Sequence, residues 1–254
     1  MTEKVQKYLA RIGVDAAEAT APTYTLLQRL QLAHLTHIPY ENLDIMRDVP
    51  LQLNEDALFD KMVTRRRGGY CFELNGLFAW LLRGLGYDVA EFFGRFLRGE
   101  AEIPMRRHRV LQVTCADGVF LSDVGVGQAI PRAPLPLAVG QKWDIHGETY
   151  IIEADDFLGY VLLEAYKGDW RRVYAFTTEP QLPADFEAIS FYCEKYPASY
   201  FRTEDMVHIF TPTGRKSIAG RTFKQFTPEG VTVQHLENDA AYITLLTNEF
   251  GIVL

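Results

Sequence analysis

The stretch RRRGGYCFELNG (residues 65–76) places a cysteine where a helix is predicted to begin. Cys71 follows Gly68 and Gly69, which allow a tight turn and leave room for a substrate. The unpaired N–H groups and partial positive charge of a helix N-terminus stabilise a thiolate and lower the pKa of a thiol. Cys71 is therefore a candidate nucleophile. The alternative interpretation is a small buried residue packed within a structural helix.

A nucleophilic cysteine needs a base, and His108 is the candidate among the six histidines. It begins a predicted strand, RHRVLQV, among arginines. On that strand His108 shares a face with Gln112 and Thr114, because side chains alternate between the two faces of a strand. This more polar face is suited to lining a cleft. A surface histidine at a strand edge fits the same pattern.

Asp123 is the candidate for holding the imidazole in the correct tautomer. It ends the apolar strand VFLSD, where an acid is expected to be partly buried and paired, or else to cap a turn. A two-residue turn at Asp117-Gly118 would place Asp123 opposite Gln112, four residues from His108. The predicted hairpin therefore does not by itself bring the acid to the base.

The elements that must position these residues fall into three segments. Residues 1–86 show helical spacing of apolar residues, with Gly13 as a stop and Asn54 as a cap. Residues 87–180 are rich in β-branched and aromatic residues and contain three predicted hairpins, which favour an antiparallel sandwich or small barrel. Residues 181–254 follow a proline-containing linker and read as a small unit of strands and helices.

Composition excludes several classes of protein. The 254 residues are 48% hydrophobic and 23% charged, as expected of a globular protein with a sizeable core. A net charge of −7 disfavours nucleic-acid and anionic-membrane partners. No apolar run approaches the ~18 residues of a membrane span, and the N-terminus is charged where a signal peptide is apolar. Three cysteines, an odd number, favour a reducing compartment, so we expect a cytoplasmic protein.

Two basic clusters stand out from this acidic composition. They are Arg65 to Arg67, and Arg106, Arg107 and Arg109. Each is interpreted as solvated surface or as local attraction for an anionic ligand. We favour solvated surface for Arg65 and Arg66.

Five motifs, in this order, resemble those of the arylamine N-acetyltransferase family. They are IPYENLD (38–44), RGGYCFELN (67–75), RHRVLQV around His108, LSDVGVG (121–127), and YPASYF with FTPTG (196–214). The most specific signal is RGGYCFELN together with the later His and Asp. The motifs span most of the chain.

The resemblance implies an α+β fold: a helical bundle (1–86) carrying the cysteine, an antiparallel β-barrel (87–180) carrying His and Asp, and an α/β lid (181–254). The catalytic core would be like that of transglutaminases and papain-like cysteine proteases. It assigns Cys71, His108 and Asp123 to a catalytic triad. The implied reaction is two-step acetyl transfer from acetyl-CoA, as co-substrate and without a metal, through a Cys71 thioester to an arylamine or hydrazine.

The resemblance also implies ligand contacts. For coenzyme A these are Gly125, Val126, Gly127, Thr211 and Gly214, with Arg215 added on charge alone. For the acceptor they are Tyr40, Val126 and Phe201. Tyr40 and Val126 replace phenylalanines of the common family pattern, which leaves the acceptor preference open. The Glu41-Asn42 pair is expected to stabilise the fold through buried hydrogen bonds.

Other functions remain open at this point. One is a related amide synthase that uses the same triad with a larger acyl chain. Another is a thiol hydrolase that cleaves amides and ignores coenzyme A. A third is a non-catalytic binder of coenzyme A or an aromatic ligand. The sequence makes no prediction of the oligomeric state.

Overall fold

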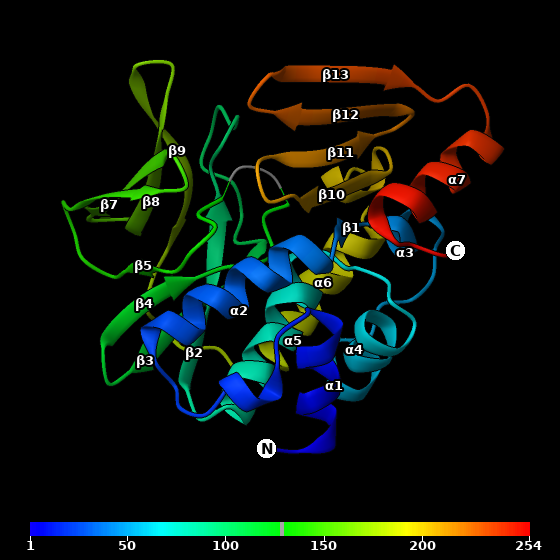
Figure 1. The fold of residues 1–254 in the computed structure, drawn as a ribbon. Coiled ribbons are helices and arrows are strands. Elements are labelled where there is room, and N and C mark those ends of the chain that lie inside the picture. The colour runs from blue at the N-terminus through cyan, green and yellow to red at the C-terminus, as the bar shows by residue number, and fades with distance from the viewer. Residues whose placement is uncertain (128–129) are drawn as a thin grey trace.

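The computed structural model describes residues 1–127 and 130–254. Figure 1 shows three groups of elements. Helices from the N-terminal third lie beside a strongly curved sheet made from the middle of the chain. A second sheet, drawn in orange, lies above the helices, with the C-terminal helix α7 beside it. Among the described residues, no helix combines the length and the apolarity needed to cross a membrane.

The N-terminal segment is mainly helical. Its elements are α1 (Glu3–Arg11), the 3₁₀ helix η1 (Ala16–Glu18), α2 (Tyr24–His37), strand β1 (Tyr40–Glu41), α3 (Leu43–Met46), α4 (Glu55–Phe59), the π-helical turn η2 (Asp60–Thr64) and α5 (Cys71–Gly84). The apolar face of α1 is buried, and its Tyr8 ring stacks on Trp80 of α5. Gly13, at φ 71°, follows the end of α1, and the Asn54 side chain caps α4 as predicted.

The middle of the chain forms an antiparallel sheet of eight strands in the order β5-β4-β3-β2-β9-β8-β7-β6. The strands are β2 (Asp88–Phe96), β3 (His108–Cys115), β4 (Gly118–Ser122), β5 (Leu135–Pro136), β6 (Lys142–Ile145), β7 (Glu148–Asp155), β8 (Gly159–Tyr166) and β9 (Asp169–Phe176). The three predicted hairpins, β3–β4, β6–β7 and β8–β9, are confirmed. The chain leaving β5 bonds to β4 through Leu137 N and to β7 through Gly140 N, so the sheet nearly closes into a barrel.

The register of the β3–β4 hairpin differs from the expected one. Cys115 pairs with Gly118, so the two turn residues are Ala116 and Asp117 rather than Asp117 and Gly118. Leu111 consequently lies opposite Ser122, and Asp123 follows at the end of β4. The shift moves Asp123 two residues nearer to His108 than the predicted turn would. Gly118 is the first residue of β4, and its φ of 138° is a conformation that favours glycine.

The C-terminal segment forms a five-stranded antiparallel sheet in the order β1-β10-β11-β12-β13. Its elements are α6 (Asp185–Lys195), the 3₁₀ helix η3 (Tyr200–Arg202), β10 (Met206–Phe210), β11 (Arg215–Ala219), β12 (Thr222–Thr227), β13 (Gly230–His235) and α7 (Asp239–Phe250). Two strands of this sheet were not predicted from the sequence: β11 and the edge strand β1, which comes from the N-terminal segment. Because β1 completes this sheet, the helical segment and the lid are joined by backbone hydrogen bonds. The boundaries after residues 86 and 180 stay predictions.

Candidate active site

Cys71 is the first residue of α5, and 3% of it is exposed. Tyr70 is the residue before the helix, and Glu73 follows it by three positions. The Glu73 carboxylate accepts a hydrogen bond from the backbone N–H of Tyr70 at 3.1 Å. This acid satisfies one of the free N–H groups at the helix start and fixes the turn into α5. The local sequence thus positions the cysteine backbone before any long-range contact is made.

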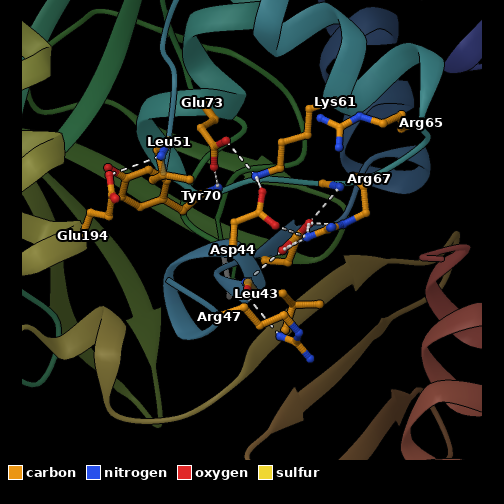
Figure 2. Close-up of polar contacts among 12 residues, drawn as sticks. Leu43, Asp44, Arg47, Leu51, Lys61, Arg65, Arg67, Tyr70, Glu73 and Glu194 are labelled. Atoms are coloured by element: carbon orange, nitrogen blue, oxygen red, sulfur yellow. Dashed lines mark hydrogen bonds and ion pairs between the residues drawn. The ribbon is translucent and has the colours of Figure 1, made fainter. Parts of the chain in front are cut away.

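A buried network of charged side chains supports this turn, formed by Glu41, Asp44, Lys61, Arg67 and Glu73. Figure 2 shows Asp44, Lys61, Arg67 and Glu73 in this network. Lys61 of η2 contacts Asp44 at 2.7 Å and Glu73 at 2.8 Å. Arg67 contacts Asp44 at 2.9 Å and the Glu41 carboxylate at 2.8 Å. The surrounding carboxylates outweigh the burial of Lys61 and raise its pKa, whereas burial raises the pKa of Glu73. The network ties the loop before Cys71 to the β1–α3 segment.

This network corrects the interpretation of the first basic cluster. Arg65 and Arg66 are exposed, as favoured, and Arg65 pairs with Asp60. Arg67 is instead 8% exposed and belongs to the buried network.

Gly68 and Gly69 also differ from expectation. A Cβ on Gly68 would collide with the carbonyl of Pro39, and a Cβ on Gly69 would lie 2.9 Å from Glu73. These glycines allow close packing inside the protein rather than room for a substrate.

His108 and Asp123 meet where β3 begins and β4 ends. His108 begins β3, and its Nε2 lies 2.6 Å from Oδ2 of Asp123. Both side chains are about 3% exposed. The other carboxylate oxygen, Oδ1, accepts hydrogen bonds from Asn75 at 2.8 Å and from the backbone N–H of Gly125 at 2.7 Å. With Nε2 occupied, Nδ1 is the ring nitrogen left for a reacting group.

Asn75 and Tyr174 also contact this pair of residues, and the sequence analysis assigned neither a role. Asn75 is fully buried on α5, one turn after Cys71. It donates to Asp123 and to the carbonyl of Arg109 and accepts from Val124 N, so it joins the helix to both strands. Asn75 lies four residues after Cys71, on the same face of the helix, and this spacing was the sequence signal that could have identified it.

Tyr174 contacts the pair from the barrel. Burial and the hydrogen-bonded Asp123 carboxylate raise the pKa of the Tyr174 hydroxyl well above its usual range.

The Cys71 thiol donates to the carbonyl of Arg107 at 3.7 Å. Cys71 and His108, which are both among the described residues, form no hydrogen bond with each other. Burial raises the pKa of the Cys71 thiol, while the backbone N–H groups of Arg109 and Phe72 act in the opposite direction. The fold therefore reverses the shift expected from the helix start alone. A thiolate at this position needs a positively charged partner.

Cys71 and His108 line one cavity of about 370 Å³. Tyr40, Val126 and Phe201, the residues predicted for the acceptor, also line it. The remaining lining residues are Phe96, Arg98, Gly99, Glu100, Arg107, Gly125, Tyr200, Met206 and His208. The cavity thus draws on α5, on the barrel strands β2 and β3, and on the lid.

The residues predicted to contact coenzyme A are only partly brought together. Gly125 and Val126 line the cavity, and a Cβ on Gly125 would lie 2.8 Å from Cα of Cys71. Gly127, at φ 76°, packs against the ring of Tyr40. Thr211 and Gly214 close the β10–β11 turn outside the cavity lining.

Two arginines lie beside that turn. Arg215 is half-buried against the ring of Phe226, 3.9 Å from its centroid. Arg132, which the sequence analysis did not single out, reaches the carbonyls of Thr211 and Pro212. Burial and the positive charge of Arg132 lower the pKa of Arg215. Positive charge is therefore concentrated beside the β10–β11 turn.

The arginines of the second basic cluster also differ from one another in burial and in their partners. Arg109 is 4% exposed, pairs with Glu91 and lies over the ring of Phe186. Arg107 lines the cavity and pairs with Glu100.

Within residues 1–127 and 130–254, no group of three or more His, Cys, Asp or Glu side chains is arranged to hold a metal ion.

Comparison with known proteins identifies the family. A family model described as N-acetyltransferase matches residues 23–254. The arylamine N-acetyltransferase of Mycobacterium tuberculosis is 38% identical over 251 residues, which cover 96% of this chain and 88% of that relative. The chain belongs to the arylamine N-acetyltransferase family. The resemblance stated from the motifs is confirmed, and membership makes the protein an acyltransferase enzyme.

Solved structures agree with this assignment. The arylamine N-acetyltransferase of Salmonella typhimurium superposes with a TM-score of 0.94 at 30% identity, covering 99% of this chain and 92% of that one. The Mycobacterium marinum enzyme, solved in complex with CoA, gives 0.91 at 36% identity, covering 98% and 92%. The predicted α+β fold of helical bundle, antiparallel barrel and lid is confirmed.

Proposed function

We propose that the protein transfers an acetyl group from acetyl-CoA, through a thioester on Cys71, to an arylamine or hydrazine. The main support is the placement of Cys71 and His108 on one cavity, with His108 Nε2 held 2.6 Å from Asp123. Family membership supports acetyl transfer, and the Mycobacterium marinum relative was solved with CoA. Cys71 is the nucleophile, His108 the base and Asp123 the residue that orients the imidazole.

In the first step the Cys71 thiol gives its proton to Nδ1 of His108. The sulfur attacks the thioester carbonyl of acetyl-CoA, the carbon–sulfur bond to CoA breaks, and the CoA thiolate takes the proton from His108. Because burial raises the thiol pKa, the thiolate forms as an ion pair with the imidazolium. The backbone N–H of Cys71, at the start of α5, is one donor for the developing oxyanion.

In the second step the acceptor nitrogen attacks the acetyl carbon of the thioester. His108 takes a proton from the attacking nitrogen, and the Cys71 thiolate leaves as the amide forms. Tyr40, Val126 and Phe201 supply mainly apolar surface for the aromatic ring of the acceptor. Aminolysis of a thioester is downhill, whereas acetyl exchange between two sulfur atoms is nearly balanced.

Coenzyme A would lie along the loop after Asp123 and beside the β10–β11 turn. Because Gly125 has no side chain, the backbone of this loop can lie close to Cys71. Gly127, Thr211 and Gly214 would line the route outward. Arg215, with Arg132 nearby, would meet phosphate groups, since guanidinium groups bind phosphate through paired hydrogen bonds.

Intact-protein mass spectrometry with acetyl-CoA and no acceptor tests the nucleophile and the donor together. We expect a mass increase of one acetyl group in the wild-type protein and in the control Cys115→Ala, and none in Cys71→Ala. Turnover of 5-aminosalicylate or hydralazine should likewise disappear in Cys71→Ala. An adduct that persists in Cys71→Ala, or acetylation that this variant retains, would contradict the proposal. Preference for longer acyl-CoAs over acetyl-CoA would favour the amide synthase alternative.

A further inference from the structure

A second histidine, His208, faces the cavity from the lid. It lies on β10, two residues after Met206, so both side chains are on the same face of the strand. Tyr40 of β1 is its partner across the strand pair, and the two ring centroids are 5.8 Å apart. All three residues line the cavity that contains Cys71 and His108. The proposed mechanism uses His108 and leaves His208 without a role.

The two ring nitrogens of His208 form no hydrogen bond with the described residues. Its Nδ1 is buried without a hydrogen bond. Its Nε2 also has no hydrogen bond to any of the described residues, but it is not among the buried atoms, so the ring edge that carries Nε2 is the one open to the cavity. Because Nε2 is open to the cavity and makes no hydrogen bond there, it is the ring nitrogen that a ligand can reach.

The protonation state of His208 decides what it can offer. Burial and the neighbouring positive charge of Arg215 lower its pKa to about 4, so the ring is neutral near pH 7. A neutral imidazole has one N–H and one bare nitrogen. An orphaned buried N–H is rarer in proteins than an orphaned acceptor, so we place the bare nitrogen at the buried Nδ1 and the N–H at Nε2. His208 therefore presents a hydrogen-bond donor to the cavity.

We propose that His208 is a specificity-determining residue whose Nε2–H donates a hydrogen bond to an oxygen substituent, a carboxylate above all, on the aromatic ring of the acceptor. The inference rests on the proposed acetyl transfer to an arylamine. The lining carries one more positive than negative charge among its described residues: Arg98 and Arg107 line the cavity, and Glu100 is their only carboxylate there. Arg107 pairs with Glu100, and Arg98 pairs with Glu164, which lies outside the lining. The aromatic ring would lie near Tyr40 and Phe201.

The test compares acceptors that differ only in this substituent. His208→Phe keeps an aromatic contact with Tyr40 and removes the donor. We expect kcat/KM for at least one of 3- and 4-aminobenzoate to fall about tenfold, mainly through KM. For 3- and 4-methylaniline we expect less than a twofold change. For each acceptor, dividing kcat/KM of the variant by kcat/KM of the wild type cancels the intrinsic reactivity of that acceptor.

A second variant separates hydrogen bonding from shape. His208→Gln places an amide N–H near the position of Nε2 and should recover most of the lost activity toward the aminobenzoates. The rate at which acetyl-CoA acetylates Cys71 should be the same in all three proteins. Equal losses for all acceptors, no rescue by glutamine, or slowed acetylation of Cys71 would overturn the inference. Absence of the acetyl adduct in the wild-type protein would instead overturn the proposed function.

Discussion

Three of the hydrogen bonds that Asp123 makes together dictate the tautomer of His108. Its Oδ1 accepts from Asn75 and from Gly125 N, and its Oδ2 faces Nε2 of His108. Both groups around Oδ1 are donors, so Oδ2 is the oxygen available to hold a proton on Nε2. That arrangement leaves Nδ1 free to accept a proton from Cys71.

Asp123→Asn should therefore disable His108 without unfolding the protein. The new carbonyl oxygen would still face Asn75 and Gly125 N, and the amide N–H₂ would face Nε2 of His108 and force its proton onto Nδ1. We expect the rate of Cys71 acetylation to fall by a factor on the order of 10³–10⁴. Stopped-flow or quenched single-turnover measurement gives this rate, and circular dichroism checks the fold.

Asp117→Asn is the matched control, because Asp117 lies in the exposed β3–β4 turn and caps Tyr24 N. It should acetylate Cys71 at the wild-type rate. An Asp123→Asn protein that folds and keeps more than about a tenth of the rate would show that Asp123 does not orient His108.

At the scale of elements, the start of α5 depends on charges from three separate segments. Lys61 lies between Asp44 and Glu73, and only 7% of its side chain is exposed. Removing one member of a buried ion network leaves its partners charged and unpaired, which costs more than the intact network contributes. The loop before Cys71 is thus sensitive to a residue ten positions upstream.

Lys61→Met should lower the free energy of unfolding by about 3–5 kcal/mol. Arg65→Met is the control: Arg65 also pairs with an acid, Asp60, but both side chains are more than half exposed, and exposed pairs contribute about 0–1 kcal/mol. Urea unfolding followed by fluorescence measures both variants. Similar losses in the two variants would show that the burial of Lys61 does not govern its contribution.

At the scale of the whole molecule, burial of a neutral histidine links stability to pH. His34 of α2 is fully buried, and its Nδ1 lies 2.7 Å from the hydroxyl of Tyr8. Burial, together with the charges of Arg11 and His37, lowers the pKa of His34 from 6.5 to about 3. Below pH 6.5 the unfolded chain binds a proton that the native protein does not, so stability falls as the pH falls toward 3.

His34→Asn removes this titration and keeps an acceptor for Tyr8. At pH 7 the wild-type protein should be the more stable one. Between pH 7 and pH 5 its advantage should shrink by about 2 kcal/mol, because only the wild-type chain gains the unfolded-state proton. Urea unfolding of both proteins at the two pH values measures this change. A stability difference that does not vary with pH would mean that His34 titrates normally in the native protein.

The sequence by itself determined the local features. The spacing in α1, the Asn54 cap and the hairpins depend on residues close together in the chain, and the structure contains all of them, with the β3–β4 turn shifted by one residue. The motifs around Cys71, His108 and Asp123 indicated the family, because each is a short run of specific residues. Local patterns also predicted that a strand begins at His108 and a helix at Cys71.

Only the tertiary structure decided what depends on distant residues. The pairing of β1 with β10 and the burial of Arg67 both follow from contacts that no local pattern encodes. Burial likewise reversed the expected shift in the pKa of Cys71, since desolvation depends on every segment packed around the thiol. His208 lay outside the motif residues singled out from the sequence, and only the cavity gives its unpartnered nitrogens a chemical meaning.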